Sequence, residues 1–374
     1  MPKFFLYKWG MKQPFGLALL ACAGFSICVC VCAHAEDQAK ITPRVLLIAT
    51  YETGKDTGDT PGELQLWAER EKLTEAISVP GIEHPLLTNG KGLYAMVSGV
   101  TSRSALSLMS LAMNDRFDLT HTYILLSGIG GADPKAATLG SAVWVRSVLD
   151  GDPAYEIDSR ETPKSWPYGT IALGTTEPGK APVGSDAPAA GLTEESSGGV
   201  GKIVFHLNRP LVDWAYNLTR NVKLGDSPAM KKDREHFSAY PAAAAPPGVI
   251  EGDSLGTDHF WHGAIMTRWA EDWVTAYTHG EGKLAISDCE DQGIVLAADR
   301  LGQLGRVDPR RLLVLRTASN FTLQAPGVTA ERSLFDGLVT SSGYLPALEA
   351  AYTTGGVVVH KLLDGWDEYN ERVP

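Results

Sequence analysis

Side chains that could bind or activate a small polar molecule follow several apolar runs of this sequence, where buried strands would end. They are carboxylates, hydroxyls, an amide, a thiol and one arginine, at Glu52, Glu63, Ser102, Arg103, Asp253, Ser254, Cys289, Glu290, Ser319 and Asn320. Parallel strands present their carboxyl ends along one edge of a sheet, so we expect these groups to converge. The mixture suits a ligand with hydroxyls and a heterocycle better than phosphate alone. Each residue taken singly also fits a helix cap or a turn.

A glycine-rich segment is expected to supply the backbone of this pocket. Residues 123–126 are predicted to form a strand, and Gly128, Gly130 and Gly131 follow in a turn that reaches Pro134. Because glycine has no side chain, a ligand could approach the backbone N–H groups of the turn closely. The alternative is a tight connection whose glycines adopt positive φ angles.

Metal and covalent chemistry receive little support from the sequence. His259 and His262 are three residues apart, but no third strong ligand stands at a suitable spacing, so we expect no metal site. Cys289 has no histidine close to it in the sequence to activate its thiol. No cofactor is expected. Ser102 and Arg103 stand at a predicted helix start that could hold an anion, which leaves phosphate open as a cosubstrate.

Alternating apolar runs and amphipathic segments predict the scaffold. Strands are expected over 44–50, 92–98, 123–126, 142–145, 248–252, 284–287 and 311–317. Helices are expected over 63–73, 104–113, 211–219, 229–240, 259–277, 290–304 and 344–366, the last with a soft centre at its two glycines. This alternation predicts one α/β sandwich with a largely parallel central sheet. Segment 174–199 reads as a long surface loop, and 241–247 as a linker-like break.

The first 35 residues have the features of an export signal. Three lysines precede an apolar run from Phe15 to Val31, and Ala33-His34-Ala35 offers a cleavage site, although a retained membrane anchor is the alternative. Cleavage would remove four of the five cysteines and leave Cys289, so no disulfide is expected within the mature chain. It would also make the net charge of −11 more negative, which argues against nucleic acid as a partner. We therefore expect a periplasmic or secreted protein.

Several long motifs resemble those of the purine nucleoside permease family of bacteria and fungi. They are residues 97–145, from VSGVTSRSALSLM to GSAVWV, then DGD and YEIDSRE, GDSLGTDHFWHG, ISDCEDQG and LRTASNF. The resemblance covers nearly all of the chain after residue 35. It implies the fold of nucleoside phosphorylases and nucleosidases, a three-layer α/β sandwich, as a single domain over 36–374.

The same resemblance implies roles for individual residues. Glu290 would bind the ribose 2′- and 3′-hydroxyls, with Cys289 against the sugar. Glu63 looks like the acid that positions water in nucleosidases, and Glu52 is the competing candidate. Asn320 stands where nucleosidases carry a proton-donating aspartate, although some purine nucleoside phosphorylases use asparagine for the base. The base is expected to contact Asn320, Ser319, Asp253 and Ser254.

The function implied is processing of purine nucleosides in support of their uptake. Breaking an N-glycosidic bond passes through a cation-like sugar, which a nearby carboxylate stabilises. Hydrolysis is favoured over phosphorolysis because the phosphate-binding arginines of phosphorylases are not matched, apart from a substitute in Arg103. The alternative is a nucleoside-binding protein without chemistry that passes its ligand to a separate membrane transporter. Whether the protein forms a homo-oligomer stays open.

Overall fold

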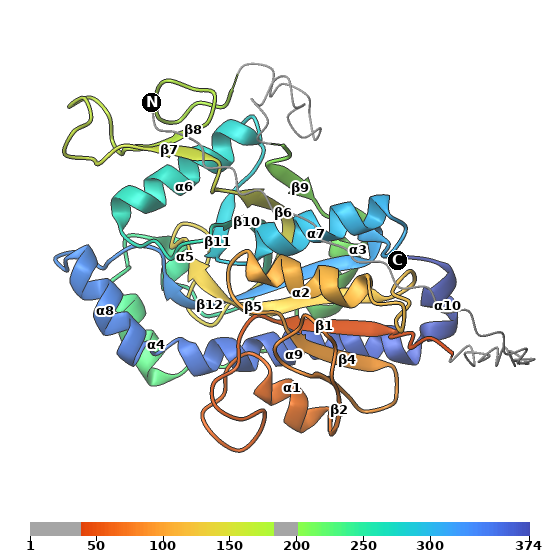
Figure 1. Cartoon of the computed structure of the whole chain (residues 1–374). Helices are drawn as coiled ribbons and strands as arrows, with labels where there is room; N and C mark the ends of the chain where they lie inside the picture. The colour runs from red at the N-terminus through yellow and green to blue at the C-terminus, as the bar shows by residue number, and fades with distance from the viewer. Residues whose placement is uncertain (1–38, 183–200) are drawn as a thin grey trace, which may run out of the picture. The chain divides into compact units, whose positions relative to one another are not determined.

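The computed structural model describes residues 39–182 and 201–374. Within these ranges ten strands form one sheet in the order β11-β10-β6-β12-β5-β1-β4-β3-β2, with β9 paired to β6 (Figure 1). The strands are β1 (Val45–Ala49), β2 (Glu75–Ile77), β3 (Leu86–Thr88), β4 (Leu93–Val97), β5 (Tyr123–Ala132), β6 (Ala142–Asp150), β9 (Val204–His206), β10 (Val249–Gly256), β11 (Leu284–Asp288) and β12 (Leu312–Phe321). A separate hairpin joins β7 (Ala154–Glu156) to β8 (Thr170–Ala172).

The longest strand pairings are parallel. They join β1 to β4 and β5, β5 to β12, and β10 to β6 and β11. The antiparallel pairings involve the edge strands and two short contacts, β12 with β6 and β11 with the end of β5. The predicted mixed α/β class with a mostly parallel sheet is therefore confirmed.

The contact between β11 and β5 closes part of the sheet into a ring. Ile286 and Ser287 of β11 pair with Ala132 and Gly131 at the end of β5, while β11 also pairs with β10. Strands β5, β12, β6, β10 and β11 thus form a closed five-membered circuit. The predicted three-layer sandwich stays a prediction, because this closure differs from an open, flat central layer.

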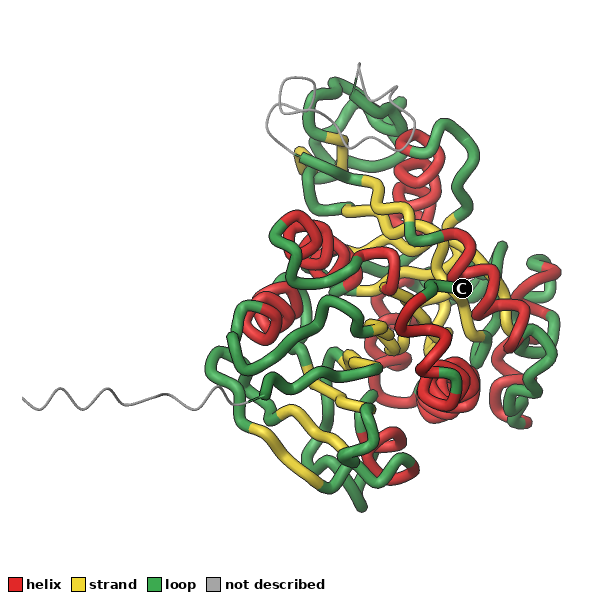
Figure 2. Tube along the Cα trace, turned by 90° about the vertical axis from the view of Figure 1, so that its right-hand side faces the viewer, coloured by secondary structure: helices red, strands yellow, loops and turns green. Residues whose placement is uncertain are grey.

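Helices lie on both sides of the strands (Figure 2). They are α1 (Gln65–Arg70), α2 (Arg103–Ala112), α3 (Arg209–Thr219), α4 (Pro228–Glu235), α5 (Pro241–Ala244), α6 (Ala264–Tyr277), α7 (Asp291–Gln303), α8 (Ala330–Thr340), α9 (Tyr344–Asp364) and α10 (Trp366–Glu371), with a 3-10 turn at Pro309–Arg311. The long helix α9 packs on β12 and β5, and α2 packs on α7. No helix of the described ranges combines the length and the apolar character that crossing a membrane requires.

The core explains why β1 reads as a continuous apolar run. All five of its residues are fully buried, as expected for a strand covered on both faces. Helix α9 continues without a break through Gly355, where an added Cβ would lie 3.0 Å from Trp67 Cη2. The expected soft centre of this helix is therefore wrong: the glycine allows Trp67 to pack closely.

The glycine-rich segment is a strand and not the predicted turn, since β5 continues to Ala132. A Cβ at Gly128 would lie 2.5 Å from Glu63 Oε1, and one at Gly130 would lie 2.6 Å from Ser287 O. Positive φ does not explain these glycines, because in this region only Gly140 has one, at 75°. They are required because neighbouring polar groups approach the strand too closely for any side chain.

Other boundaries also differ from expectation. Strands β10 and β12 continue through stretches predicted to be loops, residues 253–256 and 318–321. Helix α6 begins at Ala264 and not at 259, because Gly263 has a φ of 116° that a helix cannot include. The break at 241–247 contains the short helix α5, and α8 was not expected. The predicted export signal lies outside the described residues, as does most of the predicted 174–199 loop.

Candidate active site

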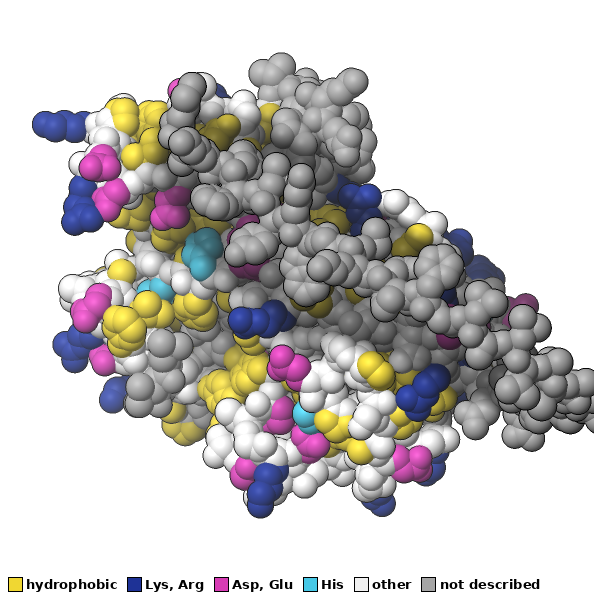
Figure 3. Space-filling model, viewed as in Figure 1, with side chains coloured by type: hydrophobic (Ala, Val, Ile, Leu, Met, Phe, Trp, Pro, Cys, Tyr) yellow, Lys and Arg dark blue, Asp and Glu magenta, His cyan; other side chains and the backbone are white. Residues whose placement is uncertain are grey.

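A cavity of about 370 Å³ lies where the carboxyl ends of β1, β4, β5, β11 and β12 meet. Its walls are formed by Thr50, Tyr51, Glu63, Val100, Thr101, Ile129, Gly130, Gly131, Asp258, His259, Phe260, Trp261, Ser287, Asp288, Cys289, Glu290, Ser319, Asn320 and Thr322. The volume is in the range of small-molecule sites. On the face shown in Figure 3, hydrophobic side chains gather around a hollow, and a Lys or Arg side chain lies beside it, while most lysines and arginines lie towards the edges.

Glu63 faces the cavity from the loop before α1. Its Oε2 accepts hydrogen bonds from the backbone N–H (2.7 Å) and hydroxyl (2.8 Å) of Thr50, and its Oε1 accepts one from the N–H of Ile129 (2.7 Å). A carboxylate has about four acceptor positions, so one remains on Oε1. Burial raises the pKa of Glu63, and the Arg316 guanidinium opposes this shift. The side chain is therefore fixed in place with one acceptor position left for a ligand or water.

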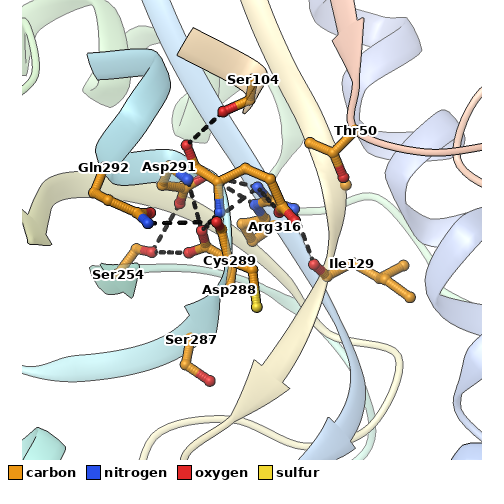
Figure 4. A network of polar contacts seen from close by, with 12 residues as sticks. Thr50, Ser104, Ile129, Ser254, Ser287, Asp288, Cys289, Asp291, Gln292 and Arg316 are labelled. Atoms are coloured by element: carbon orange, nitrogen blue, oxygen red, sulfur yellow. Dashed lines mark hydrogen bonds and ion pairs between the residues drawn. The ribbon is translucent and has the colours of Figure 1, made fainter. Parts of the chain in front are cut away.

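Arg316, on β12, is the shared partner of a cluster of buried acids at this end of the cavity (Figure 4). Its Nη2 lies 3.0 Å from Glu290 Oε2 and 2.8 Å from Asp291 Oδ1, and its Nη1 donates to Ile129 O at 3.0 Å. Glu63 and Asp288 complete a set of four buried carboxyl groups within 4 Å of this one guanidinium. Because a single positive charge cannot neutralise four negative ones, burial favours retention of protons by the acids.

Glu290 is the acid of this cluster best placed to meet a ligand. It is the N-cap residue of α7, and its Oε2 is bonded to Arg316. No side chain or N–H of the described residues donates to its Oε1. Burial raises the pKa of Glu290 to about 7, opposed by Arg316 and assisted by the charges of Asp288 and Glu63. At neutral pH this carboxyl can accept bonds from hydroxyl groups or carry a proton.

Asp288 and Asp291 hold Glu290 and the start of α7 in place through hydrogen bonds. Asp288 Oδ1 accepts from the N–H groups of Glu290 (2.9 Å) and Asp291 (2.7 Å), which fixes the start of α7. The hydroxyl of Ser254 lies 2.5 Å from Asp288 Oδ2 and 2.7 Å from Asp291 Oδ2. One hydroxyl proton cannot satisfy two carboxylates, and burial raises the pKa of Asp291 well above its ordinary value.

Asn320 lines the cavity at the end of β12, where a bulge interrupts the pairing with β5. Its Nδ2 donates to Phe321 O (3.1 Å), and its Oδ1 accepts from the hydroxyl of Ser319 (2.9 Å). The amide is thus oriented by its neighbours and keeps its second N–H. Asn320 lies within β12, so it does not stabilise a turn after the strand, and its contact with the base stays a prediction.

Cys289 and an aromatic loop complete the walls. Burial raises the pKa of the Cys289 thiol to about 12, which disfavours the thiolate that a nucleophilic cysteine requires. Residues 259–261, predicted to begin a helix, form instead a loop that brings Phe260 and Trp261 to the cavity. Gln292 holds this loop through a 3.2 Å bond to Asp258 Oδ1.

Several predicted site residues do not reach the cavity. Glu52 accepts from the N–H groups of Leu64 (2.8 Å) and Gln65 (2.6 Å), so it organises the start of α1. Ser102 and Arg103 begin α2 outside the cavity wall, and Gly128 lies behind it against Glu63. The expected anion site at α2 therefore does not open into the cavity.

Asp253 and Ser254 are also absent from the cavity wall, which corrects their assignment to the base. Asp253 Oδ2 accepts from the N–H of Lys283 at 2.6 Å, and Ser254 bridges the two aspartates below Arg316. Residues Gly252–Gly256 spell Gly-x-Ser-x-Gly, the pattern of a nucleophile elbow. They lie within strand β10, however, and Ser254 bonds two acids and no histidine. The hydroxyl is therefore held between two buried carboxyl groups away from the cavity wall, and it lacks the histidine of a nucleophile elbow.

The sequence reasoning missed Arg316, Thr322 and Ser287. Arg316 carried a usable signal, because a charged residue inside the run LLVLRT must be paired once that strand is buried. Ser287 and Thr322 carried none, since serine and threonine are common at strand ends. No group of three or more potential metal ligands occurs within the described residues, and His262 bonds Ser333 on α8 at 3.0 Å.

The charge of the cavity limits what it can hold. Glu63, Asp258, Asp288 and Glu290 are acids of its wall, and no lysine or arginine is among the described wall residues. Such a lining repels anions and favours neutral ligands that offer hydroxyl donors. It also stabilises positive charge that develops on a bound molecule.

The raised pKa of Glu290 predicts how stability depends on pH. Between the ordinary value of 4.5 and about 7, the folded protein retains a proton that the unfolded chain has released. Stability should therefore fall as pH rises through this window, and Glu290→Gln should remove the effect. The stability of the variant relative to wild type should increase by about 3 kcal/mol across the window.

Urea denaturation of both proteins at a series of pH values measures this difference. Buried acids outside the Arg316 cluster, such as Asp150, whose pKa burial raises to about 7, contribute equally to both proteins and cancel. A difference in stability that does not change with pH would show that Glu290 ionises normally.

A family model and a related protein that match this sequence both concern purine nucleoside permeases. The model of the purine nucleoside permease (NUP) family matches residues 42–374. A purine nucleoside permease of Candida albicans (strain SC5314) is 24% identical over 348 residues, which cover 91% of this chain and 79% of the relative.

Two enzymes are among the solved structures that resemble this chain in backbone fold. A 5′-methylthioadenosine/S-adenosylhomocysteine nucleosidase from Neisseria meningitidis superimposes with a TM-score of 0.48 and 13% identity, covering 85% of this chain and 100% of the enzyme. Futalosine hydrolase of Helicobacter pylori superimposes with a TM-score of 0.49 and 12% identity, covering 86% of this chain and 98% of the hydrolase.

Proposed function

The chain belongs to the purine nucleoside permease family, and from this premise we propose that its cavity binds purine nucleosides and hydrolyses their N-glycosidic bond. The observation that carries the proposal is the pair of carboxyl groups, Glu63 and Glu290, that face one cavity and share the buried Arg316. Two carboxyls in distinct environments can take two roles. Glu290 holds the sugar, and Glu63 holds the attacking water.

Glu290 lines the cavity and no donor of the described residues bonds its Oε1, so the ionised group would accept bonds from the ribose 2′- and 3′-hydroxyls. Its negative charge then lies beside the sugar as the bond to the base breaks and positive charge develops. Because the interaction strengthens with this charge, it lowers the barrier as well as binding the substrate.

Glu63 is the candidate for holding water because one acceptor position of its Oε1 remains. The carboxylate would orient the water and take its proton as the oxygen attacks the sugar. The pKa of Glu63 is raised by burial, which makes it a stronger base than an exposed glutamate. Asn320 would donate a hydrogen bond from its remaining N–H to the departing purine anion, which then takes a proton from solvent water.

Water is favoured over phosphate because the described cavity wall contains acids and no lysine or arginine. Bringing a phosphate dianion beside Glu63 and Glu290 would be opposed by like charge. Phosphorolysis would also need a site for phosphate. Ser102 and Arg103, the residues expected to form an anion site, lie outside the described cavity wall.

The experiment is incubation of the purified protein with inosine and with adenosine, each with and without phosphate. We expect base release that is independent of phosphate, with free ribose as the second product. Inosine should react faster, because an amide at Asn320 can bond a 6-oxopurine without the repulsion that a carboxylate would add. Release that requires phosphate and yields ribose 1-phosphate would contradict hydrolysis.

The second candidate is a protein that binds nucleosides without cleaving them. It is favoured by the chemistry of Asn320, whose local bonds leave one N–H for a ligand and whose amide has no acidic proton to give a departing base. Tight binding of inosine with no release of hypoxanthine would select this candidate. Export by removal of residues 1–35 and transfer of ligand to a separate transporter rest on sequence alone. N-terminal sequencing of the exported protein tests the first of these.

A further inference from the structure

We propose that the hydroxyl of Thr322 recognises the base of the bound nucleoside, on an edge of the cavity that it shares with Ser287 and Asn320. This inference rests on the proposed function, since it assigns the groups that select the base. It concerns residues at the ends of β11 and β12 that are not part of the acid cluster around Arg316.

The hydroxyl of Thr322 is buried and unpaired. The residue is 2% exposed and lines the cavity, yet its Oγ1 has no hydrogen-bond partner within the described part of the chain. Its backbone is fixed on both sides, because its N–H donates to Ala132 O and its carbonyl accepts from the N–H of Gly263, both at 2.9 Å. A buried hydroxyl without a partner is destabilising, so a ligand that supplies one is the simplest reason for its presence.

Gly131 leaves room for three side chains to pack against its backbone. A Cβ added there would lie 3.1 Å from Asn320 Nδ2, 3.1 Å from Ser287 Oγ and 3.3 Å from Thr322 Cγ2. The amide of Asn320, the hydroxyl of Ser287 and the methyl group of Thr322 thus surround one bare stretch of backbone on β5. Ser287 and Asn320 already have bonds to Gly131 O and Phe321 O, which leaves Thr322 as the unpaired member.

The edge is neutral, in contrast to the acidic end of the cavity. Figure 4 shows Ser287 apart from the Arg316 cluster, with no interaction drawn between them. A purine presents ring nitrogens and an exocyclic group that accept or donate, and a hydroxyl can serve either role. Phe260 and Trp261 line the same cavity and offer aromatic surface to a flat ring. The acids suit the sugar, and this edge suits the base.

The test replaces Thr322 with valine, which has the same shape but no hydroxyl. Calorimetric titration of the full-length protein with inosine and with hypoxanthine should show both affinities reduced by about tenfold. The midpoint of thermal unfolding without ligand should rise by about 1–3 °C, because the unsatisfied hydroxyl is gone. Thr322→Ser keeps the hydroxyl and should bind both ligands within about threefold of wild type.

Thr354→Val is the matched control. Thr354, on α9, is also fully buried with an unpaired Oγ1, but it does not line the cavity. We expect a similar gain in thermal stability and unchanged affinities. Glu290→Gln should weaken binding of inosine and spare hypoxanthine, which separates a sugar contact from a base contact.

The outcomes distinguish this inference from the function on which it rests. Wild-type affinities for both ligands in Thr322→Val would overturn the role of Thr322 and leave the proposed function standing. A wild-type protein that binds neither ligand would overturn the proposed function itself.

Discussion

Replacing Arg316 with methionine should destabilise the folded protein by about 3–5 kcal/mol at about pH 8. The guanidinium is 1% exposed and is the shared partner of Glu63, Asp288, Glu290 and Asp291. Its removal leaves buried carboxylates without a positive charge, which is among the most destabilising changes a core can undergo. Urea denaturation followed by tryptophan fluorescence measures the loss.

The loss should be smaller at low pH, because the orphaned carboxyls then carry protons in both the folded and the unfolded states. Arg311→Met is the matched control. Arg311 is 4% exposed, but its guanidinium donates mainly to the carbonyls of Tyr369 and Asn370, each at 2.7 Å. It should show a loss with little dependence on pH. A pH-independent loss in Arg316→Met as well would contradict the charge cluster.

Glu63→Gln should reduce the rate of base release from inosine by about 10²–10⁴-fold, the usual contribution of a general base. The amide cannot take the water's proton. In addition, both carboxylate oxygens of Glu63 accept from backbone N–H groups, of Thr50 and Ile129, so an NH₂ at either position meets a donor. The variant should therefore also lose about 1–3 kcal/mol of stability, and rates must be expressed per folded molecule.

Glu52→Gln isolates the catalytic part of that effect. Glu52 likewise accepts backbone N–H groups through both oxygens, from Thr53 and Leu64, and stands close to the same helix start. It does not line the cavity. The variant should lose comparable stability and keep its rate per folded molecule. If Glu52→Gln lost the activity and Glu63→Gln kept it, the roles of the two acids would have to be exchanged.

The sequence predicted the scaffold well where one local signal was sufficient. Strand β1 is recognisable in the sequence as a run of aliphatic residues, because both of its faces are covered. The convergence of Glu63, Glu290 and Asn320 followed from the geometry of parallel strands, and their place in one cavity agrees with it. These predictions needed only the hydrophobic pattern of the sequence and the rule that parallel strands have their carboxyl ends at the same edge of a sheet.

Predictions failed where distant residues decide the outcome. Gly128, Gly130 and Gly131 read as a turn, but they are a strand whose glycines make room for Glu63, Ser287 and Asn320. Nothing local marks that requirement, since two of those three neighbours lie more than 150 residues away in the sequence. The pattern around Ser254 likewise gives no hint that its hydroxyl bridges Asp288 and Asp291. Tertiary contacts, and not propensity, set these features.

In the proposed reaction, water bound in this cavity attacks the sugar of a purine nucleoside. The most direct measurement is incubation of the wild-type protein with inosine in heavy-oxygen water, without phosphate, followed by mass spectrometry of the products. Hydrolysis predicts free hypoxanthine and ribose that carries the heavy oxygen at its anomeric carbon. Inosine recovered intact, or hypoxanthine released only when phosphate is added, would contradict the proposed reaction.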